Sequence, residues 1–110
     1  MNEPLLIYTT WPDPESARAF AAEAVDARLA ACANILPPMT SIYRWQGALE
    51  QATETPMLLK TTSGAVDALR DRFRAVHPYE TPAFVALPLA EAASHAPFLA
   101  WIREETSPPA

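Results

Sequence analysis

The sequence predicts an α+β sandwich of the split βαβ type, in which two helices cover one face of a sheet. Strand-like and helix-like segments follow one another in the order β, α, β, β, α, β, and a further helix ends the chain. Two right-handed βαβ crossovers in this order place both helices on the same face, which is the ferredoxin-like arrangement. The chain has 110 residues, half of them hydrophobic, enough for one domain spanning residues 1–110.

The first strand and helix are marked by prolines and a capping sequence. Leu5 to Trp11 is a short apolar and β-branched run between two prolines, which is typical of a buried strand. Asp13, Pro14 and Glu15 then supply an N-cap, a proline for the first helical position and an acidic residue near the positive helix end. The apolar residues of this helix repeat at intervals of three and four: Ala17, Phe20, Ala21, Ala24, Val25 and Leu29.

A long β-hairpin follows in the middle of the chain. Asn34 to Trp45 and Glu50 to Thr61 are strand-like, and Gly47 marks the turn between them. Two strands of about twelve residues extend roughly 40 Å, whereas a compact domain of this length has a radius of gyration of only about 13 Å. The hairpin should extend beyond its own domain and expose apolar side chains unless another chain covers them, which predicts an oligomer.

Prolines predict a bend in this hairpin. If the turn centres on Gly47 and Ala48, Pro56 lies roughly opposite Met39, next to the Pro37-Pro38 pair, so both strands are interrupted at one level. The alternative is a shorter hairpin in which the proline pair forms a plain loop.

The second half of the chain supplies a helix, a strand and the final helix. Val66 to Val76 has helical apolar spacing, and Pro78 requires this helix to end by His77. Ala83 to Leu87 lies between two prolines and is a last short strand. The final helix begins between Ser94 and Pro97.

Composition narrows the function classes. A net charge of -5 with eight basic residues provides no positive surface for phosphates, so neither nucleic acid nor a membrane is an expected partner. One cysteine excludes an intramolecular disulfide, and the first residues lack the basic and apolar parts of a signal peptide, so we expect a cytoplasmic protein. Two glycines cannot build a phosphate-binding loop, and no catalytic signature is present, so no enzyme activity is predicted.

Two places carry candidate metal ligands. His77 and Glu80 lie with Tyr79 in the loop after the second helix, and imidazole and carboxylate groups bind metal ions. Alternatively, His77 caps the negative end of that helix. Cys32 lies between the first helix and the hairpin; its thiolate would suit Cu(I), but an unpaired cysteine among alanines is also typical of a small buried residue.

Aromatic residues on the first hairpin strand form a third candidate site. Tyr43 and Trp45 are two residues apart, so their side chains share one face of a strand. They can stack on a ligand or form an aromatic contact between subunits.

Four motifs give the sequence a resemblance to a known family. They are Ala31 to Ile35, Thr40 to Gly47, Leu59 to Thr61 and His77 to Glu80. In this order and spacing the chain resembles the CutA divalent-cation-tolerance family over nearly its whole length, and Phe98 to Ile102 fits that family's C-terminal helix.

The resemblance implies a compact homotrimer assembled through the long hairpins, similar to the PII signalling proteins. It implies a cytosolic metal-binding or metal-response protein for copper (Cu²⁺ or Cu⁺) or another divalent cation, without an organic cofactor. A PII-like small-ligand signalling trimer with a pocket between subunits, or a structural or anchoring trimer, are the alternatives. The residues expected at these sites are Cys32, His77 and Glu80 for metal, and Trp45, Lys60 and Tyr79 for a pocket between subunits.

Overall fold

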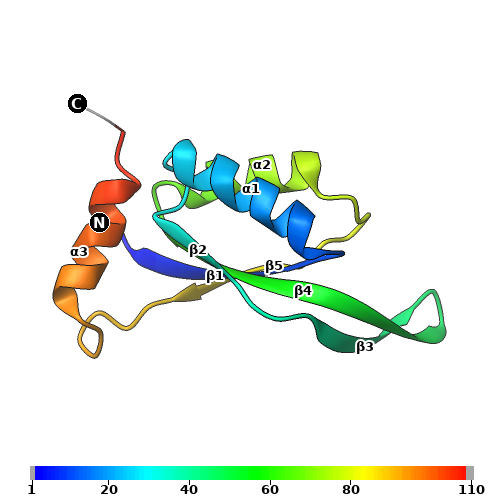
Figure 1. Cartoon of the computed structure of the whole chain (residues 1–110). Helices are drawn as coiled ribbons and strands as arrows, with labels where there is room; N and C mark the ends of the chain where they lie inside the picture. The colour runs from blue at the N-terminus through cyan, green and yellow to red at the C-terminus, as the bar shows by residue number, and fades with distance from the viewer. Residues whose placement is uncertain (1, 109–110) are drawn as a thin grey trace.

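The computed structural model describes residues 2–108 and confirms the predicted α+β fold (Figure 1). The elements, in chain order, are β1 (Pro4–Trp11), α1 (Pro14–Asp26), β2 (Cys32–Ile35), β3 (Met39–Trp45), β4 (Ala48–Thr62), α2 (Val66–Val76), β5 (Phe84–Pro88) and α3 (Ala96–Glu105). Helices α1 and α2 lie side by side on one face of the sheet, and α3 lies at one end of it (Figure 1). None of the helices within residues 2–108 is long and apolar enough to cross a membrane.

The sheet has the split βαβ topology that the element order predicts. Its strand order is β2-β4-β1-β5, every neighbouring pair is antiparallel, and β3 pairs with the remaining length of β4. Strand β4 thus separates β1 from β2, and β1 separates β4 from β5. The last strand begins and ends one residue later than the predicted Ala83 to Leu87.

The core lies between the sheet and the two covering helices. Its buried members include Ile7, Trp11, Ala17, Phe20, Met57, Leu59, Leu69 and Phe73. The indole ring of Trp11 lies with its centroid 5.3 Å from Phe20 and 5.4 Å from Phe73, so one aromatic cluster joins β1 to both helices. Asp13 caps α1 as predicted, because its carboxylate accepts a hydrogen bond of 2.7 Å from the Ser16 backbone N–H.

The hairpin is long and bent, as predicted, but its first strand is broken. Asn34 to Trp45 forms two strands, β2 and β3, with Pro37 and Pro38 in the gap. Three residues, 36–38, separate the last β2 pair from the first β3 pair, whereas only residues 55–56 separate the same pairs on β4. The extra residue is a bulge, which bends the ladder.

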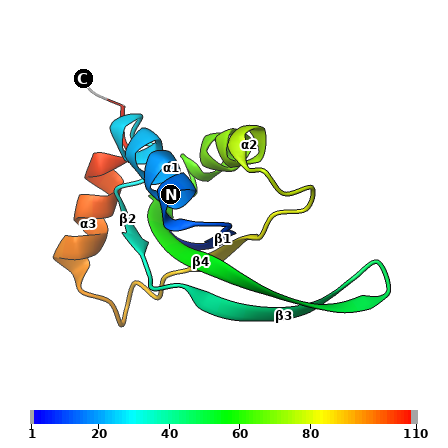
Figure 2. The ribbon, with the colours of Figure 1, turned by 45° about the vertical axis from the view of Figure 1, so that its right-hand side comes forward.

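The observed pairing also corrects the predicted register. Met39 pairs with Glu54, and Pro56 lies opposite Leu36, whose backbone N–H donates a hydrogen bond of 3.0 Å to the Pro56 carbonyl. Beyond the bend, residues 39–54 form a two-stranded projection that we call the arm (Figure 2). The longest dimension of the chain is consequently 48 Å, against 28 and 23 Å for the other two.

The sheet face opposite α1 and α2 is largely open. Side chains alternate along strands, so this face carries Leu6, Tyr8, Cys32, Asn34, Leu58, Lys60, Val85 and Leu87. Helix α3 covers only one end of this face, where the hydroxyl groups of Thr62 on β4 and Thr106 at the end of α3 are 3.2 Å apart. Val85 and Leu87 are 48% and 45% exposed, and Ile42 and Leu49 of the arm are 66% and 72% exposed. Apolar surface of this extent marks a protein interaction site.

The arm turns at Gln46 and Gly47, where φ is +50° and +82°. Two successive positive φ angles fit the two-residue hairpin turn that matches strand twist. A Cβ atom added to Gly47 would meet nothing within 4 Å, so the cost of Gly47→Ala comes from the backbone alone. We expect this variant to lose about 1 kcal/mol of unfolding free energy in chemical denaturation. Unchanged stability would show that the turn does not require the left-handed conformation.

Candidate functional site

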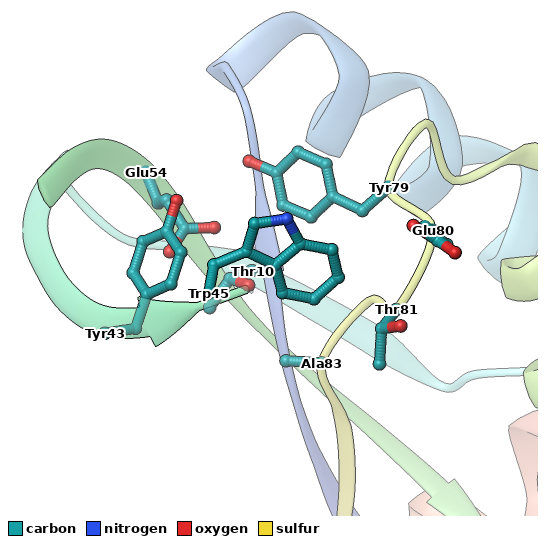
Figure 3. Close-up of a pocket in the computed structure, with 8 residues that line it drawn as sticks. All are labelled: Thr10, Tyr43, Trp45, Glu54, Tyr79, Glu80, Thr81 and Ala83. Atoms are coloured by element: carbon teal, nitrogen blue, oxygen red, sulfur yellow. The ribbon is translucent and has the colours of Figure 1, made fainter. Parts of the chain in front are cut away.

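A pocket of about 490 Å³ lies between the arm and the loop that joins α2 to β5 (Figure 3). Its lining residues are Thr10, Tyr43, Trp45, Glu54, Tyr79, Glu80, Thr81 and Ala83. In Figure 3, Tyr43 and Glu54 lie on one side of the Trp45 ring, and Glu80 and Thr81 lie on the other. The pocket therefore unites four of the candidate residues, Tyr43, Trp45, Tyr79 and Glu80.

The arm places its three pocket residues through strand alternation. Tyr43 and Trp45 occupy alternate positions of β3, which confirms their predicted shared face. Trp45 pairs with Ala48, and Glu54 lies six residues further along β4, so it points to the same side. The right-handed twist of a two-stranded ribbon then turns this side toward the loop.

On the opposite wall, His77 fixes the loop to the sheet. The residue is 8% exposed, and both of its ring nitrogens have a partner. Nε2 is 2.7 Å from the Thr10 carbonyl oxygen, and Nδ1 accepts a hydrogen bond of 3.2 Å from the Tyr79 backbone N–H. A carbonyl requires a donor and an N–H requires an acceptor, so the ring is neutral with its proton on Nε2. Both ring nitrogens are thus engaged within the chain.

The sequence left two interpretations of His77 open, a metal ligand or a cap of α2, and the structure supports the cap for its backbone only. Its backbone does end α2, since its N–H donates a hydrogen bond of 2.9 Å to the Phe73 carbonyl. The imidazole, however, does not cap the helix but joins β1 to the loop. The ring also packs against Trp11, Phe73 and Tyr79, with centroid distances of 4.4, 4.8 and 4.7 Å.

Burial lowers the pKa of His77 below its ordinary value of 6.5, although the hydrogen bond to Thr10 opposes this. In the unfolded chain the histidine takes up a proton near 6.5, so between the two pKa values the unfolded state binds more protons. We therefore expect the free energy of unfolding to fall as the pH drops below about 6.5, and this contribution to be fully present above it.

Thermal unfolding measured between pH 8 and pH 5 checks this expectation. The His77→Gln variant should show a weaker pH dependence in this range than the parent. His95→Gln is the matched control, because His95 is an exposed histidine at the start of α3. If His77→Gln keeps the parent's slope, another group is responsible.

Tyr79 connects the two walls of the pocket. Burial raises the pKa of Tyr79 to about 12, and the charge of Glu54 and a hydrogen bond to its carboxylate add to the effect. The phenol is uncharged at physiological pH, and its hydroxyl group points toward Glu54 from the loop side of the pocket (Figure 3). The arm and the loop thus face each other at this pair.

Cys32 and Lys60 lie outside this pocket. They pair with each other on the open sheet face, where burial raises the pKa of the Cys32 thiol although the charge of Lys60 opposes the shift. The Lys60 ammonium group donates a hydrogen bond to the Asn34 side-chain oxygen. A raised pKa keeps the thiol protonated, which makes it a poor metal ligand.

The predicted metal ligands Cys32, His77 and Glu80 do not converge within one chain. Lys60, the partner of Cys32, pairs with Leu6, whereas His77 binds Thr10 on the same strand β1. Four residues of strand correspond to about 13 Å. Within the part of the chain that the structure describes, no three His, Cys, Asp or Glu side chains are grouped to hold a metal ion.

Glu54 is the pocket residue that sequence reasoning missed. Its place follows from the register of the hairpin, in which it falls on the Trp45 face. A turn centred on Gly47 and Ala48 shifts the pairing by two residues, so it set Pro56 instead of Glu54 opposite Met39. Thr10 and Thr81 carried no sequence signal for a site.

The comparison with known families identifies the chain. The model of the CutA1 divalent ion tolerance protein matches residues 5–105. The chain belongs to this family. Among curated relatives it is 48% identical over 106 residues to the divalent-cation tolerance protein CutA of Thermus thermophilus, covering 96% of this chain and 99% of that protein. It is 42% identical over 99 residues to human Protein CutA; that match covers 90% of this chain and only 54% of the human protein.

Solved structures agree with this assignment. The divalent cation tolerance protein of T. thermophilus superposes with a TM-score of 0.90 at 45% identity, covering 94% of this chain and 99% of that one. A protein described as the periplasmic divalent cation tolerance protein CutA of Archaeoglobus fulgidus gives a TM-score of 0.88 at 38% identity, with the same coverages of 94% and 99%. The family fold therefore covers the whole described chain apart from its ends.

Proposed function

We propose that the protein is a homotrimer that binds divalent cations in its role in cation tolerance and performs no catalysis. The observation that carries the oligomer is the open sheet face together with the apolar arm, which a single chain leaves in water. A second and a third copy would cover these surfaces, and burial of each Å² of apolar area contributes about 25 cal/mol. The trimer implied by the family resemblance accounts for why an arm extends beyond its own core.

For the cation, the pocket supplies two carboxylates, Glu54 and Glu80. Carboxylate oxygens are suited to hard divalent ions such as Mg²⁺, Ca²⁺ and Mn²⁺. Water and a neighbouring subunit would complete the coordination. A soft copper site would instead need Cys32 of one subunit to meet His77 or Glu80 of another, and His77 would have to give up one of its hydrogen bonds.

Calorimetric titration of the metal-free protein with Mn(II), Zn(II), Cu(II) and Cu(I) tests this function. Glu54→Gln and Glu80→Gln should weaken Mn(II) binding, whereas Glu104→Gln, an exposed carboxylate on α3, should not. If Cys32→Ala weakens Cu(I) binding and His77→Ala weakens Cu(II) or Zn(II) binding, the ions bind at the soft site instead. The proposal of metal binding is wrong if the parent binds none of these ions.

Light scattering at micromolar concentration tests the trimer. The expected mass is about three times the 12.0 kDa of one chain.

We also propose a cytoplasmic location, since a lone half-buried thiol serves no disulfide framework. Because one relative is described as periplasmic, cell fractionation is the deciding measurement.

The second candidate function is a PII-like signalling trimer whose pocket binds a small molecule. The volume of about 490 Å³ and the three aromatic side chains favour it, since ligand pockets typically measure 300–1,000 Å³. A purely structural or anchoring trimer remains the third candidate, and saturable binding of any ligand in this pocket would argue against it.

A further inference from the structure

We propose that the pocket between the arm and the loop binds an organic ammonium ion, held by the faces of Trp45, Tyr43 and Tyr79 and by the carboxylates of Glu54 and Glu80. This inference rests on the pocket of the second candidate function and does not depend on metal binding. It assigns a ligand class to that pocket from the side chains that line it.

The walls of the pocket are aromatic and accessible. Within one chain, Tyr43, Trp45 and Tyr79 are 44%, 41% and 36% exposed, so the chain itself leaves their rings open to the pocket. They come from two separate segments, the arm and the loop, and surround one space (Figure 3). Rings of this kind attract a cation over their faces, and indole does so most strongly.

The charge of the pocket has one sign. Glu54 and Glu80 are its charged lining residues, and no basic side chain is found among the described residues that line it. Lys60 lies six residues beyond Glu54 on β4, which corresponds to about 20 Å of strand. Within one chain, a phosphate or carboxylate ligand would therefore meet two like charges and no basic side chain, which disfavours a nucleotide.

The size of the pocket leaves room for an organic cation. A volume of about 490 Å³ lies in the range of small-molecule sites and exceeds what one coordinated metal ion alone would fill. Hard divalent metal ions are coordinated by oxygen atoms, and the faces of aromatic rings supply none. An alkylated ammonium group is weakly hydrated and apolar at its surface, so it gains from the rings and from the carboxylates together.

The side chains around the pocket are held in position before a ligand binds, which favours affinity. The Tyr79 backbone is fixed by the Nδ1 atom of His77 at 3.2 Å, and its ring packs on the imidazole at 4.7 Å. Tyr79 and Glu54 face each other across the pocket (Figure 3). A ligand thus has little side-chain entropy to remove on binding.

The test compares choline with 3,3-dimethylbutan-1-ol, which has the same shape but a carbon atom in place of the charged nitrogen. Both are titrated into the full chain, in its native assembly, in phosphate buffer with EDTA; amine buffers would compete for the site. We expect choline to bind at least about tenfold more tightly than the neutral isostere. ATP is the anionic comparison and should bind more weakly than choline.

Three variants locate the binding. Trp45→Leu should weaken choline binding at least about fivefold and Trp45→Phe should restore part of it, because phenylalanine keeps a ring face. Glu54→Gln, which keeps the shape and a hydrogen-bond acceptor, should weaken choline but not the isostere. Glu104→Gln is the control for a carboxylate far from the pocket, and light scattering verifies that each variant keeps the parent's mass.

The inference is overturned if choline and the isostere bind equally, if neither binds saturably, or if ATP binds more tightly than choline. Its failure can be distinguished from failure of metal binding. Mn(II) binding without choline binding refutes only this inference, whereas choline binding without any metal binding refutes only the metal proposal.

Discussion

Replacing Phe73 with alanine is expected to lower the free energy of unfolding by about 3–5 kcal/mol. Phe73 of α2 is fully buried, and its ring lies with centroids 5.4, 4.8 and 5.1 Å from Trp11, His77 and Phe84. The substitution removes the apolar burial of the ring, leaves a cavity, and loses the edge-to-face and tilted ring contacts. Since a domain of this size is stable by about 5–15 kcal/mol, the loss is a large fraction of the total.

Chemical denaturation at fixed chain concentration measures this effect, because the proposed assembly would make the stability concentration-dependent. Phe73→Leu is the matched control; it keeps most of the volume and should cost only about 1–2 kcal/mol. Because His77 packs on Phe73, the alanine variant should also loosen the loop that carries Tyr79, seen as faster amide hydrogen exchange there. An alanine variant as stable as the leucine variant would show that the cluster is not the centre of the core.

The sequence predicts the elements of this fold because their signals are local. The cap at Asp13 and the helix stop before Pro78 depend on neighbouring residues, and both are found where expected. The break between Ile35 and Met39 is different, since a bulge depends on how two strands align. Counting out from an assumed turn centre set Met39 opposite Pro56, two residues beyond its observed partner Glu54.

The candidate site was even harder to predict, because it depends on contacts between segments that are distant in the sequence. The pattern of Tyr43 and Trp45 fixes their shared face, but not that the twisted arm brings this face to a loop more than thirty residues away. The sequence predicted His77 as a metal ligand because imidazole binds metal ions. In the structure, both of its ring nitrogens instead have hydrogen-bond partners within the chain. Which polar group a buried histidine binds is a tertiary property, and only Tyr79 was close enough in sequence to be anticipated.

Replacing Val85 with glutamate should convert the proposed trimer into monomers and lower its melting temperature. Val85 lies on β5 in the open sheet face, where the chain alone leaves it 48% exposed. In an isolated chain, a glutamate at this position would stay in water and change stability by no more than about 0.5 kcal/mol. If other subunits cover the face, the same carboxylate is buried without a partner, which costs several kcal/mol in each interface.

Val25→Glu is the matched control, because Val25 is the same residue type at 40% exposure but lies on α1, away from that face. Light scattering and thermal unfolding at equal chain concentration should show a mass near 12.0 kDa and a lowered melting temperature for Val85→Glu only. If both variants keep the parent's mass, the sheet face is open in the assembly and the arm alone joins the subunits. If both become monomers, the interface extends over α1, contrary to the arrangement inferred from the open face. The comparison of the two valines thus identifies the covered surface as well as the number of chains.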